Sequence, residues 1–172
     1  MKTVLDHAEV QVSQYDADFY IWTQEQAALL RQVPRDSFAL DIENLAEEIE
    51  SMGRAEISKV SSLLRQVLIH LLKMAMEPSS LSQSHWVSEI LTFQYDAVAA
   101  FTPGMRQRID LARVWDSARK TVSSLSGAES HVPSLPTICP FSLDELLAVD
   151  FDLSKMTKRM ARAIEAASRS PG

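Results

Sequence analysis

Apolar residues recur every three or four positions along most of the chain, which is the spacing of one buried face on an α-helix. The pattern is densest at Ile57, Val60, Leu63, Leu64, Val67, Leu68, Leu71 and Leu72. No segment alternates strictly between apolar and polar residues, as a half-buried strand would. The sequence therefore predicts an all-α, single-domain helical bundle of about four main helices, a short helix and a C-terminal amphipathic helix.

Capping residues indicate where the first two helices begin and end. We expect Asp16 to cap the first helix and Pro34 to end it. Asp41 should cap a long second helix that continues to Glu77 and forms the centre of the bundle. Gly53 lies inside this segment, where it is a kink, a break or the point of a close helix crossing.

The second half of the chain should hold the remaining helices. One of them presents Trp86, Ile90, Phe93 and Ala97 at apolar spacing. Thr102 and Pro103 are typical of the N-cap and first position of the next helix, which Gly127 should close. Ser142 and Glu145 have the spacing of a capping box, S-x-x-E, which predicts a short helix there.

Composition and charge narrow the class of protein. The chain has 172 residues with a formal net charge of -6, which argues against a general nucleic-acid binder. Cys139 is the single cysteine, so an intramolecular disulfide and a thiolate zinc cluster are excluded and a reducing compartment is indicated. His70 and Lys73 interrupt the longest apolar stretch, far short of the roughly 20 residues of a membrane span. We expect a soluble cytoplasmic protein.

Four stretches of sequence carry a family resemblance: "YDADFYIWTQEQAALLR", "LDIENLAEEIESMGRAE", "HLLK" and "CPFSLDELL", in that order. They resemble a bacterial family known as domain of unknown function number twenty-nine, over about residues 15–151. The resemblance implies an all-helical bundle and no established activity. It leaves residues 1–14 as an N-terminal extension and residues 152–172 as a basic amphipathic helix and tail. Met74 stands where the family usually has an aromatic residue after His-Leu-Leu-Lys.

The acidic stretch "LDIENLAEEIESMGRAE" is the main candidate for chemistry. On a helical wheel Glu43, Glu47 and Glu50 centre about 140° from the apolar stripe of the same helix. That stripe consists of Ile42, Leu45, Ile49 and Met52, and we expect it to be buried. Arg54 follows Glu50 by four residues, the favourable order for a helix ion pair. We interpret the acids as a solvated face that the helix dipole favours.

A metal site is the alternative interpretation of the same residues. If another helix covered the acidic face, Glu43, Glu47 and Glu50 would have a suitable spacing for metal ligands, with His70 on the following segment. However, the chain lacks the paired Glu-x-x-His motifs of di-metal bundles. His70 also falls at the edge of a wide apolar arc, where a histidine is more often a hydrogen-bonded boundary residue than a ligand.

Other catalytic motifs are weak. Ser117 and Lys120 match S-x-x-K, but the partner motifs of that hydrolase class are absent from the sequence. Cys139 has no neighbouring basic residue in the sequence to lower its pKa, so packing is its simplest role. We predict no catalytic residue and no cofactor-binding residue, and we expect that the chain is not an enzyme.

The last segment, from about Leu153 to Ala167, is a basic amphipathic helix. Lys155, Lys158, Arg159 and Arg162 fall within about 100° of one another, beside a methionine-rich apolar face. That face either docks on the chain's own bundle or contacts a protein partner or a second subunit, and the basic stripe could pair with the Glu43, Glu47, Glu50 face. The sequence thus predicts a non-catalytic protein-interaction or regulatory helical module, with a metal- or small-ligand-binding bundle as the alternative.

Overall fold

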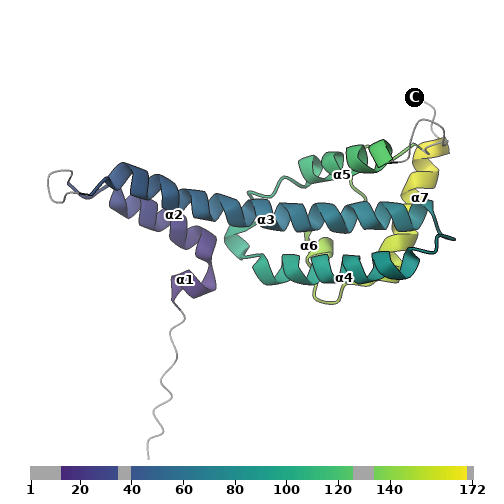
Figure 1. Ribbon diagram of the computed structural model, residues 1–172, viewed down its shortest axis with the longest axis horizontal. Coiled ribbons are helices and arrows are strands. Elements are labelled where there is room, and N and C mark those ends of the chain that lie inside the picture. Colours follow the sequence, from purple (N-terminus) through teal and green to yellow (C-terminus); the bar gives the residue numbers. More distant parts are fainter. Residues whose placement is uncertain (1–12, 35–39, 126–133, 170–172) are drawn as a thin grey trace, which may run out of the picture. The chain divides into compact units, whose positions relative to one another are not determined.

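The structure is a computed structural model that describes residues 13–34, 40–125 and 134–169 (Figure 1). These ranges hold helices and turns and no strand, which confirms the all-α prediction. The helices are α1 (Gln14–Ala17), α2 (Phe19–Leu30), α3 (Ile42–Met76), α4 (Gln83–Ala100), the 3₁₀ helix η2 (Pro103–Met105), α5 (Leu111–Leu125), α6 (Leu143–Leu146) and α7 (Leu153–Arg169). Within them no helix combines the length and the apolar character that crossing a membrane requires.

The chain divides into two compact units. Unit 1 takes Met1–Arg54 together with Thr102–Gly104, and unit 2 takes Ala55–Phe101 together with Met105–Gly172. Helix α3 is continuous from Ile42 to Met76, so its first part belongs to unit 1 and its second part to unit 2.

Unit 1 is a helical hairpin in which α2 lies antiparallel to the first part of α3 (Figure 1). The positions buried between the helices are mostly small: Tyr20, Thr23 and Ala27 on α2, and Ala46 and Gly53 on α3. Small side chains let two helix backbones approach closely, and they bury little apolar area in doing so.

Gly53 is a point of close contact between α3 and α2, one of the three possibilities that the sequence left open. Helix α3 neither breaks nor ends there. A Cβ atom built on Gly53 would lie 2.3 Å from the Thr23 Oγ1 atom and 3.2 Å from the Tyr20 Cδ2 atom. A glycine is therefore needed at this position because a larger side chain would collide with α2.

The predicted cap at Asp16 is wrong, because two helices begin in this segment and each has a different capping residue. Ser13 caps α1, and Asp18 caps α2 by accepting the Ile21 N–H at 3.1 Å. Helix α2 ends at Leu30, before Pro34. In contrast, the Asp41 cap is confirmed, since its Oδ1 accepts the Asn44 N–H at 3.2 Å.

The start of the fourth main helix also differs from the prediction. The Thr102 hydroxyl donates to Asp18 Oδ1 at 2.7 Å and the Gly104 N–H donates to Asp18 Oδ2 at 2.7 Å, so these residues fold onto α2 within unit 1. Pro103 begins only the 3₁₀ helix, while α5 begins at Leu111 with Asp110 accepting the Arg113 N–H. Gly127, the expected end of this helix, lies outside the described residues.

The core of unit 2 is built on the second part of α3, as predicted. Val60, Leu64, Val67, Leu68, Leu71 and Leu72 are all completely buried. Ile90 of α4, Leu146 of α6 and Met160 of α7 are also completely buried, and Trp115 of α5 is 1% exposed. The Ser142–Glu145 capping box forms as predicted and opens α6.

Helix α7 docks within unit 2 through its apolar face. Met156, Met160 and Ile164 are buried, which confirms the first of the two alternatives for this helix. Arg159 pairs with Glu145, and its guanidinium lies over the Phe141 ring, 5.5 Å from the centroid.

Candidate functional site

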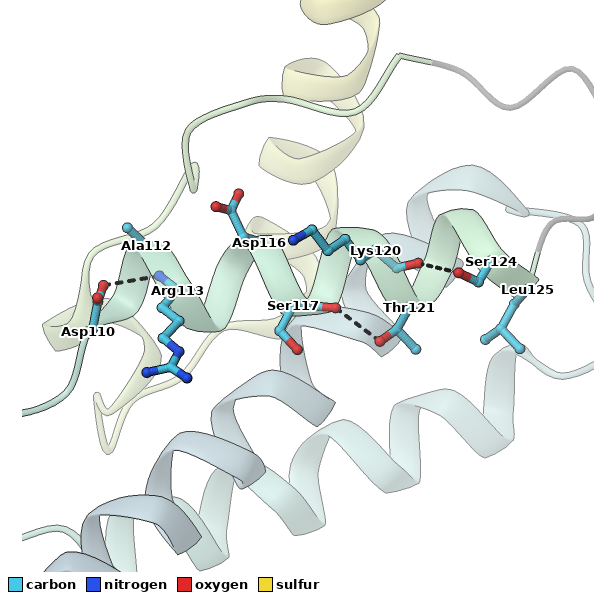
Figure 2. A pocket seen from close by; sticks show the side chains of 9 residues that line it. All are labelled: Asp110, Ala112, Arg113, Asp116, Ser117, Lys120, Thr121, Ser124 and Leu125. Carbon is cyan, nitrogen blue, oxygen red and sulfur yellow. Dashed lines mark hydrogen bonds between the residues drawn. The ribbon is translucent and has the colours of Figure 1, made fainter.

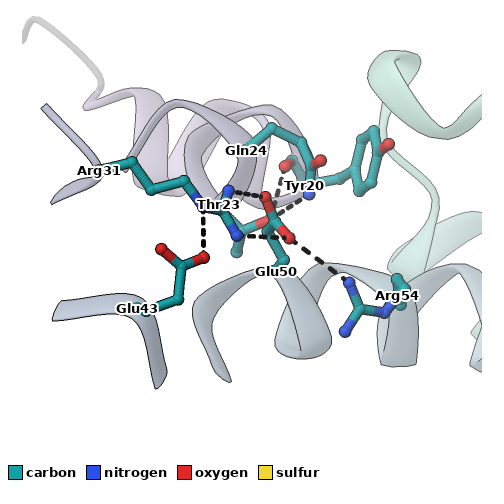
Figure 3. A network of polar contacts seen from close by, with 7 residues as sticks. All are labelled: Tyr20, Thr23, Gln24, Arg31, Glu43, Glu50 and Arg54. Carbon is teal, nitrogen blue, oxygen red and sulfur yellow. Dashed lines mark hydrogen bonds and ion pairs between the residues drawn. The ribbon is translucent and has the colours of Figure 1, made fainter. Parts of the chain in front are cut away.

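Two acidic residues of α3, Glu43 and Glu50, bind an arginine that the sequence did not single out (Figure 3). Arg31, at the end of α2, donates from Nε to Glu43 Oε1 at 3.1 Å, and both of its terminal nitrogens donate to Glu50. Arg54 completes the network at 3.7 Å from Glu50, which confirms the predicted i,i+4 pair. Glu47 is exposed. Because Arg31 is 12 and 19 residues from its two partners, no local spacing rule could have identified it.

The network favours the charged forms of Glu50 and Arg31. The hydrogen bond from Arg31 holds the pKa of Glu50 below its ordinary value of 4.5, and the two carboxylates raise the pKa of Arg31. Two acids that share one guanidinium are already satisfied as acceptors. The network is therefore an interhelical clamp of unit 1, in which Arg31, at the end of α2, binds Glu43 and Glu50 of α3.

The predicted apolar stripe of α3 is not the buried side of the helix, and that prediction is wrong. Ala46 and Gly53 are buried, whereas Leu45 is 42% exposed and Met52 is 50% exposed. Ala46 and Gly53 point toward α2. Measured around the axis of α3 from the direction midway between them, Leu45 lies at about 90° and Met52 at about 110°. The stripe is displaced because small residues, which carry little apolar signal, face α2.

Helix α2 has an apolar row on the same side of the hairpin. Measured from the residues of α2 that face α3, Phe19 lies about 70° and Leu30 about 50° around the helix. Arg31 lies about 50° in the other direction, toward Glu43 and Glu50. Since the arginine and its carboxylate partners share one side of the antiparallel pair, both apolar rows share the other. We define the hairpin's apolar face as Phe19 and Leu30 of α2 and Ile42, Leu45, Ile49 and Met52 of α3, all of them exposed or half-buried.

An aromatic cluster adjoins this face. The Tyr15 ring meets the Phe19 ring edge-on at 5.2 Å and the Trp22 ring at 4.8 Å, and Phe19 and Trp22 stack at 5.8 Å. Tyr15 is 50% exposed, so the cluster extends the apolar surface beyond the first turn of α2.

His70 is a buried hydrogen-bonded residue of unit 2. Its Nδ1 lies 2.8 Å from the Gln66 carbonyl oxygen and its Nε2 lies 2.8 Å from Glu89 Oε2, with the Phe93 ring at 5.9 Å. Both partners of the ring nitrogens are oxygen atoms on separate elements, α3 itself and α4, so the two contacts fix the orientation of the ring. His85 approaches the same Glu89 oxygen at 3.4 Å. Glu89 was missed by the sequence analysis because it lies 19 residues further along the chain.

The residues proposed for a metal site are divided between the two units. Glu43, Glu47 and Glu50 belong to unit 1 and His70 belongs to unit 2. In the part of the chain that the structure describes, no group of three or more His, Cys, Asp or Glu side chains could hold a metal ion. Two of the four candidates bind Arg31 and a third binds Glu89, so their ligand atoms already have protein partners.

An open groove runs along one side of α5 (Figure 2). It is lined by Asp110, Ala112, Arg113, Asp116, Ser117, Lys120, Thr121, Ser124 and Leu125, all from one segment. The Thr121 and Ser124 hydroxyls donate to backbone carbonyls of the same helix, and Figure 2 shows the Lys120 ammonium on the Asp116 side, away from the Ser117 hydroxyl. Nucleophilic catalysis needs a base within hydrogen-bond reach of the nucleophile, which this groove does not supply to Ser117.

Cys139 has the character of a packed thiol. It is half-buried, and burial raises its pKa above the ordinary value of 9.0. Reactive cysteines need the opposite shift, because the thiolate is the nucleophile.

Comparison with known proteins shows the family of this chain and supports its all-helical fold. The sequence model of the family described as "Domain of unknown function DUF29" matches residues 14–152. A solved crystal structure of an alpha-helical protein of unknown function from Rhodospirillum rubrum ATCC 11170 is 30% identical, with a TM-score of 0.76, over 87% of this chain and 99% of that chain. No curated protein matches the sequence. The family model spans α1 to α6, and α7 lies beyond its range. The chain belongs to the DUF29 family of helical domains of unknown function.

Proposed function

We propose that this protein is a non-catalytic protein-interaction or regulatory module that binds its partner through the hairpin's apolar face. The observation that carries the proposal is the exposure of Leu45 and Met52 on α3. On the other side of the same helix, Glu43 and Glu50 already bind Arg31. Large exposed apolar patches on soluble proteins mark interaction sites.

The energetics of the hairpin support this function. Its internal seam is made mostly of small residues, while larger apolar side chains remain outside the seam. Isolated helices of about 12 residues are marginal in water, and most of their stability in proteins comes from covering an apolar face. A partner that covers the face would therefore also stabilise unit 1.

Helix α7 supplies a second surface for a charged partner. Its apolar side chains are buried in its own unit, so the interaction that we propose through this helix uses the exposed basic side chains of Lys155, Lys158 and Arg162. Exposed charges of one sign steer association and choose among partners more than they add affinity. An acidic protein surface is the matching partner.

We further propose that the module acts in the bacterial cytoplasm. The single cysteine and the net charge of -6 are typical of a soluble protein in a reducing compartment, and the similar solved structure comes from a bacterium.

Site-specific photocrosslinking in cells tests the interaction directly. A photoreactive amino acid replaces Leu45 or Met52 in the full-length chain, and Glu47 or Lys120 serves as the matched exposed control. The proposal predicts a crosslinked product, with this chain or another protein, at positions 45 and 52 and little product at the controls. Equal yields at all four positions would contradict an interaction surface on the hairpin.

A further inference from the structure

Helix α2 is attached to the rest of unit 1 at both of its ends. At its C-terminal end, Arg31 binds Glu43 and Glu50 of α3 (Figure 3). At its N-terminal end, Asp18 binds residues 102–104, which belong to the same unit. Only three of the 12 residues of the helix are buried: Tyr20, Thr23 and Ala27. Two polar contacts and a short buried row therefore hold α2 in place.

The Asp18 carboxylate combines two tasks in one side chain. Its Oδ1 atom accepts the Ile21 N–H at 3.1 Å, which caps α2, and also the Thr102 hydroxyl at 2.7 Å. Its Oδ2 atom accepts the Gly104 N–H at 2.7 Å. Hydrogen bonds to a carboxylate are stronger than those between neutral groups. The first turn of α2 and its attachment to residues 102–104 should therefore form and break together.

Gly104 shows how closely residues 102–104 lie against the start of α2. A Cβ atom built on Gly104 would lie 2.4 Å from the Ile21 Cγ1 atom and 2.9 Å from the Asp18 Oδ2 atom. Carbon atoms in favourable contact are about 3.5 to 4.0 Å apart, so a larger residue does not fit while the contact is made. The contact can thus be weakened separately from either side, at Asp18 or at Gly104.

Helix α2 depends on these contacts to stay in place. It has 12 residues, and isolated helices of about that length are marginal in water. Protein segments with few buried apolar contacts open locally at a lower free energy than the core does. The core of unit 2 is the comparison, because Leu64 and Leu68 are completely buried there. Helix α2 should therefore open while that core stays folded.

From these observations we propose that α2 is an arm that opens and closes as one cooperative unit, with the contact of Asp18 to residues 102–104 as its latch. This inference rests on the interaction function proposed above and names its regulation. The hairpin's apolar face takes Phe19 and Leu30 from α2 and its other residues from α3, so only the closed arm presents the complete face. Closing of the arm thus sets the fraction of molecules that can bind the partner.

Hydrogen exchange of the full-length chain, followed by NMR at single amides, tests the arm. In wild type, the amides of residues 23–30 should share one protection factor, at least about 10-fold below that of residues 64–72. The core is still folded when only the arm is open. Ile90→Val, at a completely buried position, should therefore lower the protection of residues 64–72 about 2- to 10-fold and leave residues 23–30 unchanged.

The same measurement tests the latch. Asparagine caps a helix as well as aspartate does, so Asp18→Asn keeps the cap and removes one of the acceptors that hold residues 102–104. It should lower the protection of residues 23–30 about 10- to 100-fold. Asp16→Asn, at an exposed position just before α2, is the matched control and should leave that protection within about twofold of wild type.

A second variant reaches the latch without touching Asp18. Gly104→Ala should also lower the protection of residues 23–30, by at least about 5-fold, because the added methyl group separates the two sides. Asp18→Asn and Gly104→Ala break the same contact, so their combination should have less than the sum of the two effects in free energy.

Three results would overturn the proposal. If residues 23–30 exchanged as slowly as residues 64–72 in wild type, or if Ile90→Val lowered both protections equally, α2 would open only when the whole chain unfolds. If Asp18→Asn changed the protection of residues 23–30 no more than Asp16→Asn does, the Asp18 contact would not be the latch.

Failure of this inference is distinguishable from failure of the proposed function. The variant Asp18→Asn/Arg31→Ala removes both end contacts, so photocrosslinking from position 45 should fall in proportion to the open fraction that hydrogen exchange reports. A yield equal to that of Asp16→Asn, although the arm is open, keeps the interaction function and overturns its regulation. A chain without a position-specific crosslink rejects the interaction function, and hydrogen exchange still decides whether α2 is an arm.

Discussion

Gly53 of α3 lies against Thr23 of α2, so closely that a methyl group on the glycine would fall 2.3 Å from the threonine Oγ1 atom. The Thr23 hydroxyl is itself fixed, because it donates to the Tyr20 carbonyl oxygen at 2.7 Å. This contact brings the two helices of the hairpin together and leaves the larger apolar side chains outside the seam.

Replacing Gly53 with alanine should therefore destabilise the protein. Overpacking of a tight contact costs about 1 to 3 kcal/mol, whereas alanine improves helix propensity by about 1 kcal/mol. Chemical denaturation should show a lower unfolding free energy for Gly53→Ala than for wild type. The double variant Thr23→Ala/Gly53→Ala should recover part of this free energy, because it lacks the Oγ1 atom. Ala55→Gly, at an exposed position of the same helix, measures the propensity term alone. A Gly53→Ala variant more stable than wild type would refute the close contact.

The Arg31 clamp should make unit 1 sensitive to acid. The pKa of Glu50 is lowered in the folded chain chiefly by the Arg31 hydrogen bond, so its contribution to stability is complete above its ordinary pKa of 4.5 and is lost as the pH falls through the lower, folded value. In chemical denaturation, lowering the pH from about 5 to about 3 should reduce the unfolding free energy of wild type more than that of Glu50→Gln. Glu47→Gln, an exposed neighbour, should keep the wild-type acid response. Identical pH profiles for wild type and Glu50→Gln would show that the clamp does not contribute.

His70 should matter for stability, whereas its neighbour His85 should not. A glutamine at position 70 cannot reach both Gln66 and Glu89 as the two ring nitrogens do, so His70→Gln should lower the unfolding free energy by about 1 to 3 kcal/mol. The 69% exposed His85 contacts the same glutamate oxygen, and His85→Gln should change the unfolding free energy by less than about 0.5 kcal/mol. Equal effects of the two substitutions would contradict a structural role for the buried contact.

Docking of α7 should be visible in the stability of the whole chain. Met160 is completely buried, so Met160→Ala should lose about 2 to 5 kcal/mol in thermal or chemical unfolding. Lys158→Ala, on the exposed side of the same helix, is the control and should be nearly neutral. A chain truncated after Phe151 that melts like the full-length protein would show that α7 is not part of the core.

The sequence predicts those parts of the fold that depend on strong local signals. The Asp41 cap, the Ser142–Glu145 capping box and the buried positions around Leu64 and Leu68 all follow from spacing within one helix. The hairpin seam could not be predicted in this way, because Ala46 and Gly53 have weak apolar character and their burial depends on Thr23 of another helix.

The same limit applies to the candidate site. Arg31 and Glu89 find their partners through the fold and not through i,i+4 spacing. The Thr102–Pro103 pair has the chemistry of a helix start, but Asp18 uses the Thr102 hydroxyl and the Gly104 amide, so the helix begins later, after Asp110. Tertiary contacts overrode the local signal at each of these places.

The central claim is that Leu45 and Met52 belong to a binding surface and not to the core, and comparing two leucines of α3 tests it most directly. Thermal unfolding is measured for Leu45→Ala and Leu64→Ala at a protein concentration too low for association. Leu64 is completely buried, so its variant should lose about 2 to 5 kcal/mol and melt at least about 4 °C below wild type. Leu45→Ala should lose less than about 0.5 kcal/mol and melt within about 2 °C of wild type. If Leu45→Ala lowered the melting temperature as much as Leu64→Ala under these conditions, Leu45 would be a core residue and the interaction surface proposed on the hairpin would be wrong.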